Sequence, residues 1–294
     1  MRTRARIGYG AGALAVLLAA SGCGSSGPAD KPAAQTPPSA GAPGTPGGGG
    51  TASAPAQDAA GDAAWAKWGL KPMAKAPAPP ADKPIKLAKT GTVPVFSEVP
   101  TQDKVVFVTI DDGAEKDPRF VQMLTDLKVP ITMFLTKDIV KNDYAYFKPL
   151  QALGNSIQNH TVSHPVMSKL APAQQKSQIC DDQAALTQQY GTAPYLFRPP
   201  YGDGANTPAL NTAVQECGPR AVVLWRESMQ IHDMQYQAAD KKLKNGDIIL
   251  AHFRGPSDLK GETMTQMFGE MLSRIQEQGF AVARLDDYIA KPAG

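Results

Sequence analysis

The sequence predicts an α/β domain over about residues 101–294, in which helices cover a parallel β-sheet. Two observations predict this class. Short apolar segments alternate with helical segments, which is the pattern of repeated β-α units. The apolar segments are continuous, as expected for strands that are buried on both faces. The sheet is either open or closed into a barrel, and the region is shorter than the about 250 residues of a complete eight-fold barrel.

The first expected strand, 105–110, consists of β-branched and aromatic residues. The full set of expected strands is 105–110, 131–135, 155–159, 195–197, 221–225, 248–251 and 280–283. Segments with helical spacing separate these strands, and in the longest of them Ile179, Ala184 and Leu186 recur at roughly helical intervals. The expected helices are 120–127, 144–153, 172–190, 208–217, 238–244 and 263–278.

Composition and charge exclude several classes of protein. An apolar content of 42% excludes a wholly disordered chain, and a charged content of 19% excludes a long charged coiled coil. The formal net charge of +3 matches the three arginines within the first six residues. Residues 101–294 contain 20 basic and 22 acidic side chains. We therefore expect no nucleic-acid partner, because the folded region has no basic excess.

The first 22 residues have the features of an export signal. Three arginines precede an apolar stretch from 7 to about 20, which is shorter than the about 20 apolar residues of a membrane span. The small residues before Cys23 resemble the lipobox of bacterial lipoproteins. We expect 1–22 to be a lipoprotein signal peptide and Cys23 to carry the lipid. An ordinary signal peptide with an incidental cysteine is the alternative.

The segment after Cys23 is expected to be a disordered tether over residues 23–64. Of the 41 residues from 24 to 64, 35 are Gly, Pro, Ala, Ser or Thr, so this part has almost no apolar surface to bury. Residues 65–100 contain several prolines, which favour an extended strap over a long helix. Trp65 and Trp68 are interpreted as packing against the domain in preference to binding sugar.

Two further cysteines, Cys180 and Cys217, each lie in an expected helix. A lone pair of cysteines outside the membrane usually oxidises, so we expect a disulfide between neighbouring helices. Two buried free thiols are the alternative.

Polar residues of unusual type follow four of the expected strands. Because active sites of parallel α/β folds form at the carboxyl ends of the strands, these residues are candidates for a site. Histidines at positions i and i+4 share one face of a helix, which suits chelation of one metal ion. The segments are Asp111-Asp112-Gly113, His160-Thr161-Val162-Ser163-His164, Arg198-Pro199-Pro200-Tyr201-Gly202 and Leu250-Ala251-His252.

Each segment alone is a weak signal, but their order is specific. The succession Thr-Ile-Asp-Asp-Gly, His-Thr-x-x-His, Arg-Pro-Pro-Tyr-Gly and Leu-x-His resembles the polysaccharide deacetylase family, the NodB-homology enzymes of carbohydrate esterase family 4. The resemblance covers about residues 101–290. It implies a single catalytic domain of α/β class, folded as a deformed or incomplete (β/α) barrel. It also implies removal of N-acetyl, or sometimes O-acetyl, groups from a sugar with the help of a divalent metal.

The resemblance assigns a metal site and a substrate pocket. Asp112, His160 and His164 would be the metal ligands, and Leu250 and Trp225 would line the pocket. Zinc is the expected metal, with cobalt, nickel, manganese or iron as alternatives. Three protein ligands would leave open positions for water and the substrate carbonyl.

The resemblance also assigns the catalytic groups. Asp111 would be the general base, and Arg198 would hold Asp111 in place. His252 would be the general acid, and the backbone amide of Tyr201 would help to bind the oxyanion. Adjacent carboxylates can divide this work because only one is needed on the metal.

One part of the family pattern is missing after the strand that ends near 225. An aspartate there normally orients the acid histidine, and this chain has none in register. Glu227 or Asp233 could substitute for it, and His232 could replace an aromatic wall of the groove.

We therefore expect a monomeric, metal-dependent N-deacetylase anchored outside the cytoplasm by its lipid. Its substrate would be cell-wall or extracellular polysaccharide, such as peptidoglycan or a chitin-like glycan. The alternatives are an O-acetyl (xylan-type) esterase and a catalytically weakened, glycan-binding envelope protein. An iron oxygenase, which also uses two histidines and one carboxylate, is the least favoured alternative.

Overall fold

The computed structural model describes residues 59–292. The expected signal segment, Cys23 and most of the expected tether lie outside the described residues. None of the helices in the described part combines the length and apolar character that crossing a membrane requires.

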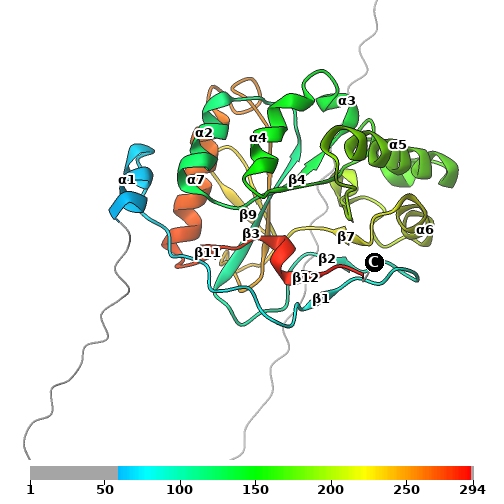
Figure 1. Cartoon of the computed structure of the whole chain (residues 1–294), viewed down its shortest axis with the longest axis horizontal. Helices are drawn as coiled ribbons and strands as arrows, with labels where there is room; N and C mark the ends of the chain where they lie inside the picture. Colours follow the sequence, from blue (N-terminus) through cyan, green and yellow to red (C-terminus); the bar gives the residue numbers. More distant parts are fainter. Residues whose placement is uncertain (1–58, 293–294) are drawn as a thin grey trace, which may run out of the picture. The chain divides into compact units, whose positions relative to one another are not determined.

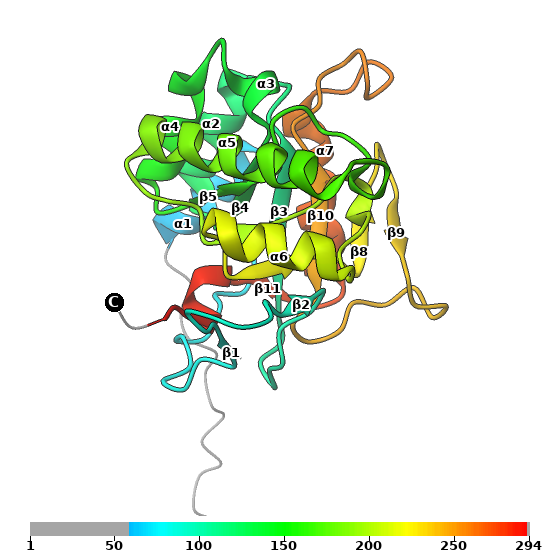
Figure 2. The ribbon, with the colours of Figure 1, turned by 90° about the vertical axis from the view of Figure 1, so that its right-hand side faces the viewer.

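A single curled sheet forms the centre of the domain, and helices surround it as in a half-open (β/α) barrel (Figures 1 and 2). Nine strands follow one another in the order β2-β7-β6-β5-β4-β3-β10-β8-β9, and β11 pairs with β3. The strands are β2 (Val95–Phe96), β3 (Val105–Asp112), β4 (Thr132–Leu135), β5 (Ser156–Asn159), β6 (Leu196–Phe197), β7 (Ala221–Val223), β8 (Glu227–Met229), β9 (Met234–Tyr236), β10 (Ile248–His252) and β11 (Ala281–Val282).

The pairing is parallel throughout this sheet except for the hairpin β8–β9. A separate parallel pair joins β1 (Ile85–Lys86) to β12 (Ile289–Ala290). Parallel pairing places the carboxyl ends of β3, β4, β5, β6 and β10 at one edge. The expected α/β class and incomplete barrel are therefore confirmed.

The helices connect successive strands and lie around the sheet (Figure 2). The α-helices are α1 (Ala59–Lys67), α2 (Pro118–Leu127), α3 (Lys137–Val140), α4 (Phe147–Ala152), α5 (Pro172–Tyr190), α6 (Pro208–Cys217) and α7 (Met264–Glu277). Short 3₁₀ helices span Tyr144–Tyr146, Met167–Lys169, Pro200–Gly202 and Leu285–Tyr288. Helix α7 begins with a capping box between Thr263 and Gln266, which satisfies backbone N–H groups of its first turn.

Strand β3 shows how alternation positions the site. Val106, Val108 and Ile110 belong to the hydrophobic cluster that includes α2 and α7, whereas Val105 and Phe107 belong to a second cluster of strand residues. Successive side chains of a strand point to opposite faces. Residue 111 therefore continues the face of Val105 and Phe107 and points into the curl of the sheet.

Residues 59–100, which precede strand β3, contact the rest of the domain through side-chain packing and strand pairing. Trp65, Trp68 and Leu70 pack against the main core cluster, which confirms packing as their role. Strand β1 pairs with the C-terminal strand β12, and β2 extends the main sheet beside β7. Helix α1 begins at Ala59, within the last residues of the range expected to be tether.

The helix expected over 238–244 is wrong, because these residues form turns and irregular structure. Lys241 has a φ of 52°, in the left-handed region that an α-helix does not use. The backbone N–H of Leu243 donates to Oε1 of Gln278 at 2.8 Å instead of to a helical carbonyl. A partner from the end of α7 therefore replaces the local hydrogen bond on which the helical pattern depends.

Cys180 of α5 and Cys217 of α6 form a disulfide in the structure, with their Cα atoms 4.7 Å apart. The bridge ties together two helices whose preceding loops carry His164 and Tyr201. The disulfide therefore links the two helices that follow these loops of the candidate site.

Candidate functional site

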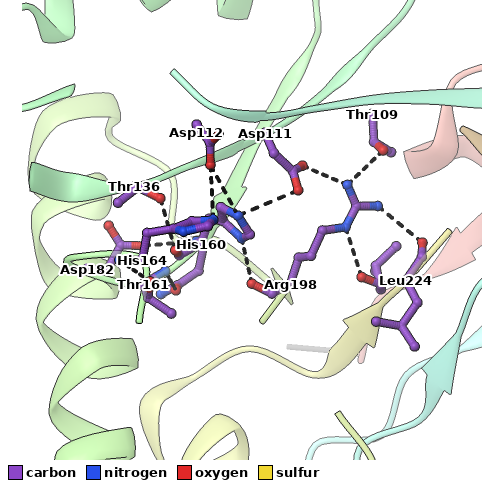
Figure 3. Close-up of polar contacts among 12 residues, drawn as sticks. Thr109, Asp111, Asp112, Thr136, His160, Thr161, His164, Asp182, Arg198 and Leu224 are labelled. Atoms are coloured by element: carbon purple, nitrogen blue, oxygen red, sulfur yellow. Dashed lines mark hydrogen bonds and ion pairs between the residues drawn. The ribbon is translucent and has the colours of Figure 1, made fainter. Parts of the chain in front are cut away.

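Side chains from four strand ends meet at the carboxyl edge of the sheet, and Figure 3 shows those that follow β3, β5 and β6. Asp111 and Asp112 end β3, and His252 ends β10 directly beside Asp111 in the strand register. His160 follows β5, and Arg198 follows β6. The structure thus brings together residues that lie up to 141 positions apart in the sequence.

Asp112, His160 and His164 form a compact group of potential metal ligands, each offering an atom within 4.8 Å of the others. Oδ1 of Asp112 lies 3.5 Å from Nε2 of His160 and 3.3 Å from Nε2 of His164. This oxygen is buried and has no hydrogen-bond partner in the described part of the chain. A buried oxygen without a partner is costly, so the geometry fits a cation at this point.

The hydrogen bonds of His160 direct one of its nitrogens to this group. Its Nδ1 lies 2.7 Å from the backbone carbonyl oxygen of Arg198, so Nδ1–H donates there. Nε2 then remains free to face Asp112 and Asp111, as in metal-binding histidines that are oriented by a carbonyl.

The expected helical arrangement of the two histidines is wrong, because His160 to His164 form a loop. Thr161 and His164 have φ angles of 74° and 57°. The N–H of Thr161 donates to Oδ1 of Asn159, and the N–H of His164 donates to Oγ1 of Thr161. Side chains that bond nearby N–H groups compete with a helix, and here they hold a loop that still directs both imidazoles to Asp112.

Asp111 is fixed by a buried arginine. Nη1 of Arg198 donates to Oδ1 of Asp111 at 2.7 Å and to Oγ1 of Thr109 at 2.8 Å. The hydroxyl of Thr109 in turn donates to the carbonyl oxygen of Ile249 on β10. Because Oδ1 is engaged, Oδ2 is the oxygen of Asp111 that faces His160, at 3.6 Å from Nε2.

Arg198 is itself fully buried and surrounded by partners. Its Nε donates to the carbonyl oxygen of Val223, and its Nη2 donates to that of Leu224. The guanidinium lies 4.2 Å from the ring centroid of Phe134 and 5.6 Å from that of Trp225. Burial lowers the pKa of Arg198, and the carboxylate of Asp111 opposes that shift.

Burial and neighbouring charges shift the pKa values of the three residues in the ligand group. Burial raises the pKa of Asp112, but the nearby imidazole of His160, whose Nε2 lies 3.5 Å from Oδ1, and the other histidines lower it to about 2. Burial lowers the pKa of His160, yet Asp111 and Asp112 outweigh it and raise that pKa. Burial and His160 lower the pKa of His164. Asp112 is therefore ionised at neutral pH and ready to bind a cation.

His252 has no ion pair or ring hydrogen bond within the described residues, and burial lowers its pKa to about 4. Glu227 pairs in register with Ile249, which places it on the face of the sheet opposite His252, and its neighbouring acid is Asp247. Asp233 is exposed and lies 3.6 Å from Nη2 of Arg274. Neither acid therefore supplies the missing partner of His252.

The remaining candidate residues line the edge of the site. Tyr201 has a φ of 60°, is 66% exposed and has its ring 4.8 Å from that of His164. Its backbone N–H has no acceptor in residues 59–292, so it is free to donate to a ligand. Leu250 is buried on β10 opposite Thr109, and Trp225 packs beside Gly202.

Sequence reasoning missed the residues that support the histidine loop. Asp182 of α5 is fully buried, and its Oδ2 accepts from the backbone N–H of His160 at 3.1 Å. Oγ1 of Thr136 donates to the carbonyl oxygen of His160. A signal for Asp182 exists, because it lies three residues after Ile179 and four before Leu186, on the apolar face of its helix.

Comparison with known proteins agrees with this geometry. A family model described as "Polysaccharide deacetylase" matches residues 98–222. A Streptomyces coelicolor protein, uncharacterized protein SCO4760, is 36% identical over 214 residues, which are 72% of this chain and 82% of that protein. A peptidoglycan-N-acetylglucosamine deacetylase of Bacillus cereus is 26% identical over 201 residues, which are 65% of this chain and 91% of that protein.

The fold is similar to that of a solved structure from the same family. The wild-type protein BA3943 of Bacillus anthracis, described as a carbohydrate esterase family 4 pseudoenzyme, matches with a TM-score of 0.54 and 19% identity. The match covers 66% of this chain and 68% of that one. Fold, ordered motifs and relatives agree, and the chain belongs to the polysaccharide deacetylase family.

Proposed function

We propose that this protein is a divalent-metal-dependent hydrolase that removes N-acetyl groups from an amino-sugar polysaccharide. One observation carries the proposal. A group of two histidines and one aspartate lies beside a second carboxylate, Asp111, which Arg198 holds at 2.7 Å. A ligand group with an adjacent oriented base is the arrangement that metal-assisted hydrolysis requires.

Asp112, His160 and His164 would hold the metal. The buried, unpartnered Oδ1 of Asp112 and the directed Nε2 of His160 support this role. A divalent ion held there would polarise the acetyl carbonyl and make an attacking water more acidic. We propose zinc, because two imidazoles and one carboxylate form a donor set typical of catalytic zinc sites. Cobalt, nickel, manganese and iron suit the same donors.

Asp111 would act as the general base through Oδ2, since Oδ1 is engaged by Arg198. The guanidinium keeps the carboxylate in one orientation, so that the proton of an attacking water is accepted at a fixed point. Arg198 is thus a positioning residue, and its contacts to two backbone carbonyls hold it in turn.

The other two groups would act on the tetrahedral intermediate. The free N–H of Tyr201 would donate to the developing oxyanion, and its left-handed backbone exposes that N–H. His252, beside Asp111 in the strand register, would deliver a proton to the departing amine. Leu250 and Trp225 would form the wall of the pocket.

We propose peptidoglycan as the substrate and a chitin-like glycan as the alternative. The Bacillus cereus relative is named for peptidoglycan N-acetylglucosamine, which supports a cell-wall glycan. A lipid on Cys23, with the segment 24–64 as a tether, would place a monomeric enzyme outside the membrane beside the wall. Globomycin should then leave an unprocessed precursor, and normal processing in its presence would exclude the lipid anchor.

A second candidate function is O-acetyl ester hydrolysis, for example on acetyl-xylan. It is favoured by the environment of His252, which forms no ion pair or ring hydrogen bond in the described part of the chain and whose pKa is lowered by burial to about 4. An alcohol leaves more readily than an amine, so an ester depends less on a general acid.

The decisive experiment measures acetate release from peptidoglycan, chitin oligomers and acetyl-xylan, with and without a chelator. We expect release from the first two, loss with chelator, and recovery on adding Zn²⁺. Asp111→Asn should abolish release, whereas Asp233→Asn, a matched change at an exposed aspartate, should not. Release from acetyl-xylan alone would replace the proposal with the esterase. No release from any substrate would leave a glycan-binding protein.

A further inference from the structure

A second group of metal-binding side chains lies outside the candidate active site. It consists of His232, Glu262 and Glu270, each with a ligand atom within 4.8 Å of the others. His232 lies in the loop of the β8–β9 hairpin, Glu262 lies in the segment between β10 and α7, and Glu270 lies on α7. Three separate parts of the chain thus supply one side chain each.

The spacing of this group is close to that of the first. Nδ1 of His232 lies 3.3 Å from both carboxylate oxygens of Glu270, and its Nε2 lies 3.8 Å from Oε1 of Glu262. Only one ring nitrogen of His232 can bind a given ion, and the shared measure is that one ligand atom from each residue lies within 4.8 Å of the other two, as in the first group. Ligands about 2.1 Å from one ion are separated by distances of this order.

The two glutamates lack a fixed positive partner. In the described part of the chain, neither carboxylate has a lysine or arginine within 4.0 Å, and His232 is the ion-pair partner of both. Arg274 lies nearby, but it contacts the carboxylate of Asp233 and the carbonyl oxygen of His232. The group therefore carries two carboxylate charges and only one imidazole to balance them.

The group is accessible to ions from solution. All three side chains line a groove of about 720 Å³ beside α7, which Trp68 and Arg119 also line. The guanidinium of Arg119 lies over the ring of Trp68, 5.9 Å from its centroid. The two carboxylates and the imidazole of His232 are therefore accessible to water, and an ion can reach them without unfolding of the domain.

We propose that His232, Glu262 and Glu270 form a second divalent-cation site, separate from the deacetylase centre. One imidazole and two carboxylates suit Zn²⁺ or Mn²⁺. An ion bound there would link the β8–β9 hairpin and the segment that directly follows His252 to helix α7. Its role would be to fix these two segments, because no ligand of this group belongs to the catalytic set.

The test measures bound Zn²⁺ per chain by equilibrium dialysis against a metal buffer that holds free Zn²⁺ at a limiting concentration. We expect two ions in the wild-type protein, one in His232→Ala and one in Glu270→Gln. Glu277→Gln is the matched control, because Glu277 lines the same groove outside the group. It should retain two ions. Zn²⁺ should also raise the Tm of His160→Ala, whose remaining site is the proposed one, and should do so less in His160→Ala combined with His232→Ala.

The outcomes separate this site from the deacetylase centre. The wild type could bind one ion that is lost in His160→Ala and kept in His232→Ala. This result would overturn the second site and leave the proposed function intact. One ion that His232→Ala removes would support the second site and count against the first. Two ions in His232→Ala, or one ion in Glu277→Gln, would overturn the assignment of these ligands.

Discussion

Glu227 and Asp247 form a buried carboxyl pair that should affect the stability of the protein but not its catalytic rate. Their exposed fractions are 2% and 1%, and each has a carboxyl oxygen without a partner within residues 59–292. Burial and the neighbouring Asp247 raise the pKa of Glu227 from 4.5 to about 8. Arg226 and Lys244 oppose this shift but do not cancel it. At neutral pH the pair therefore holds a proton in the folded protein.

The sign of the pH dependence follows from this raised pKa. Between about pH 4.5 and pH 8 the folded state keeps a proton that the unfolded state has released. The free energy of unfolding should therefore decrease as pH rises, by at most about 1.4 kcal/mol per pH unit. The stabilisation is fully present below about pH 4.5 and is lost above about pH 8.

Glu227→Gln replaces the protonated carboxyl with a neutral amide of similar shape. We expect urea denaturation, followed by tryptophan fluorescence, to give similar stabilities for variant and wild type near about pH 5 and a more stable variant near about pH 9. Asp247→Asn should shift stability in the same direction. Parallel stability curves for Glu227→Gln and the wild type would refute the reasoning.

The same variant tests the position of Glu227 relative to His252. Because Glu227 lies on the opposite face of the sheet, Glu227→Gln should leave kcat for acetate release unchanged at a pH where the protein is fully folded. A fall in kcat without a change in stability would show that Glu227 acts on the candidate acid after all.

Three further predictions concern the supports of the site. Arg198→Lys should lower kcat by about 10–100-fold, measured by acetate release, because an ammonium has three donors at one point and cannot replace the four hydrogen bonds that the guanidinium makes. Asp182→Ala should weaken Zn²⁺ binding by about 10–100-fold in a chelator competition, since the N–H of His160 loses its side-chain acceptor and keeps only the carbonyl oxygen of Leu135, and Asp182→Asn should restore most of it. Replacing both Cys180 and Cys217 with serine should reduce the free energy of unfolding by roughly 2–4 kcal/mol in urea, because the bridge closes a long loop.

Much of the fold could be predicted because its strands are continuous apolar segments. Strands β3, β4, β5, β6, β7, β10 and β11 and helices α2, α5, α6 and α7 all lie at their expected places. The hairpin β8–β9 could not be predicted, because its three-residue strands carry Glu227 and Gln235 and resemble a polar loop. The burial of Glu227 depends on Asp247 and on the sheet around it, which are not visible in the local sequence.

The candidate site could be predicted at the level of residue types and strand ends. Parallel strands bring their carboxyl ends together, so the order of the four motifs already implied that Asp112 and the histidines converge. The conformation that achieves it could not be predicted. His-x-x-x-His has helical spacing, but the side chains of Asn159 and Thr161 accept hydrogen bonds from the backbone N–H groups of Thr161 and His164. These bonds hold the segment as a loop. Asp182 was missed because, next to Asp181 in a largely polar helix, it resembles a surface residue.

Fold similarity does not decide whether the site is active, since a structure with this fold is described as a pseudoenzyme and a relative is named as a deacetylase. The decision must come from local geometry. Here Asp111, its arginine and the ligand group are in place, whereas His252 lacks a carboxylate partner. A poorly supported acid slows reactions in proportion to how much the leaving group needs a proton. The ratio of ester to amide hydrolysis on matched acetylated sugars therefore reports on His252, and introducing an acid within reach of its ring should lower that ratio by speeding amide cleavage alone.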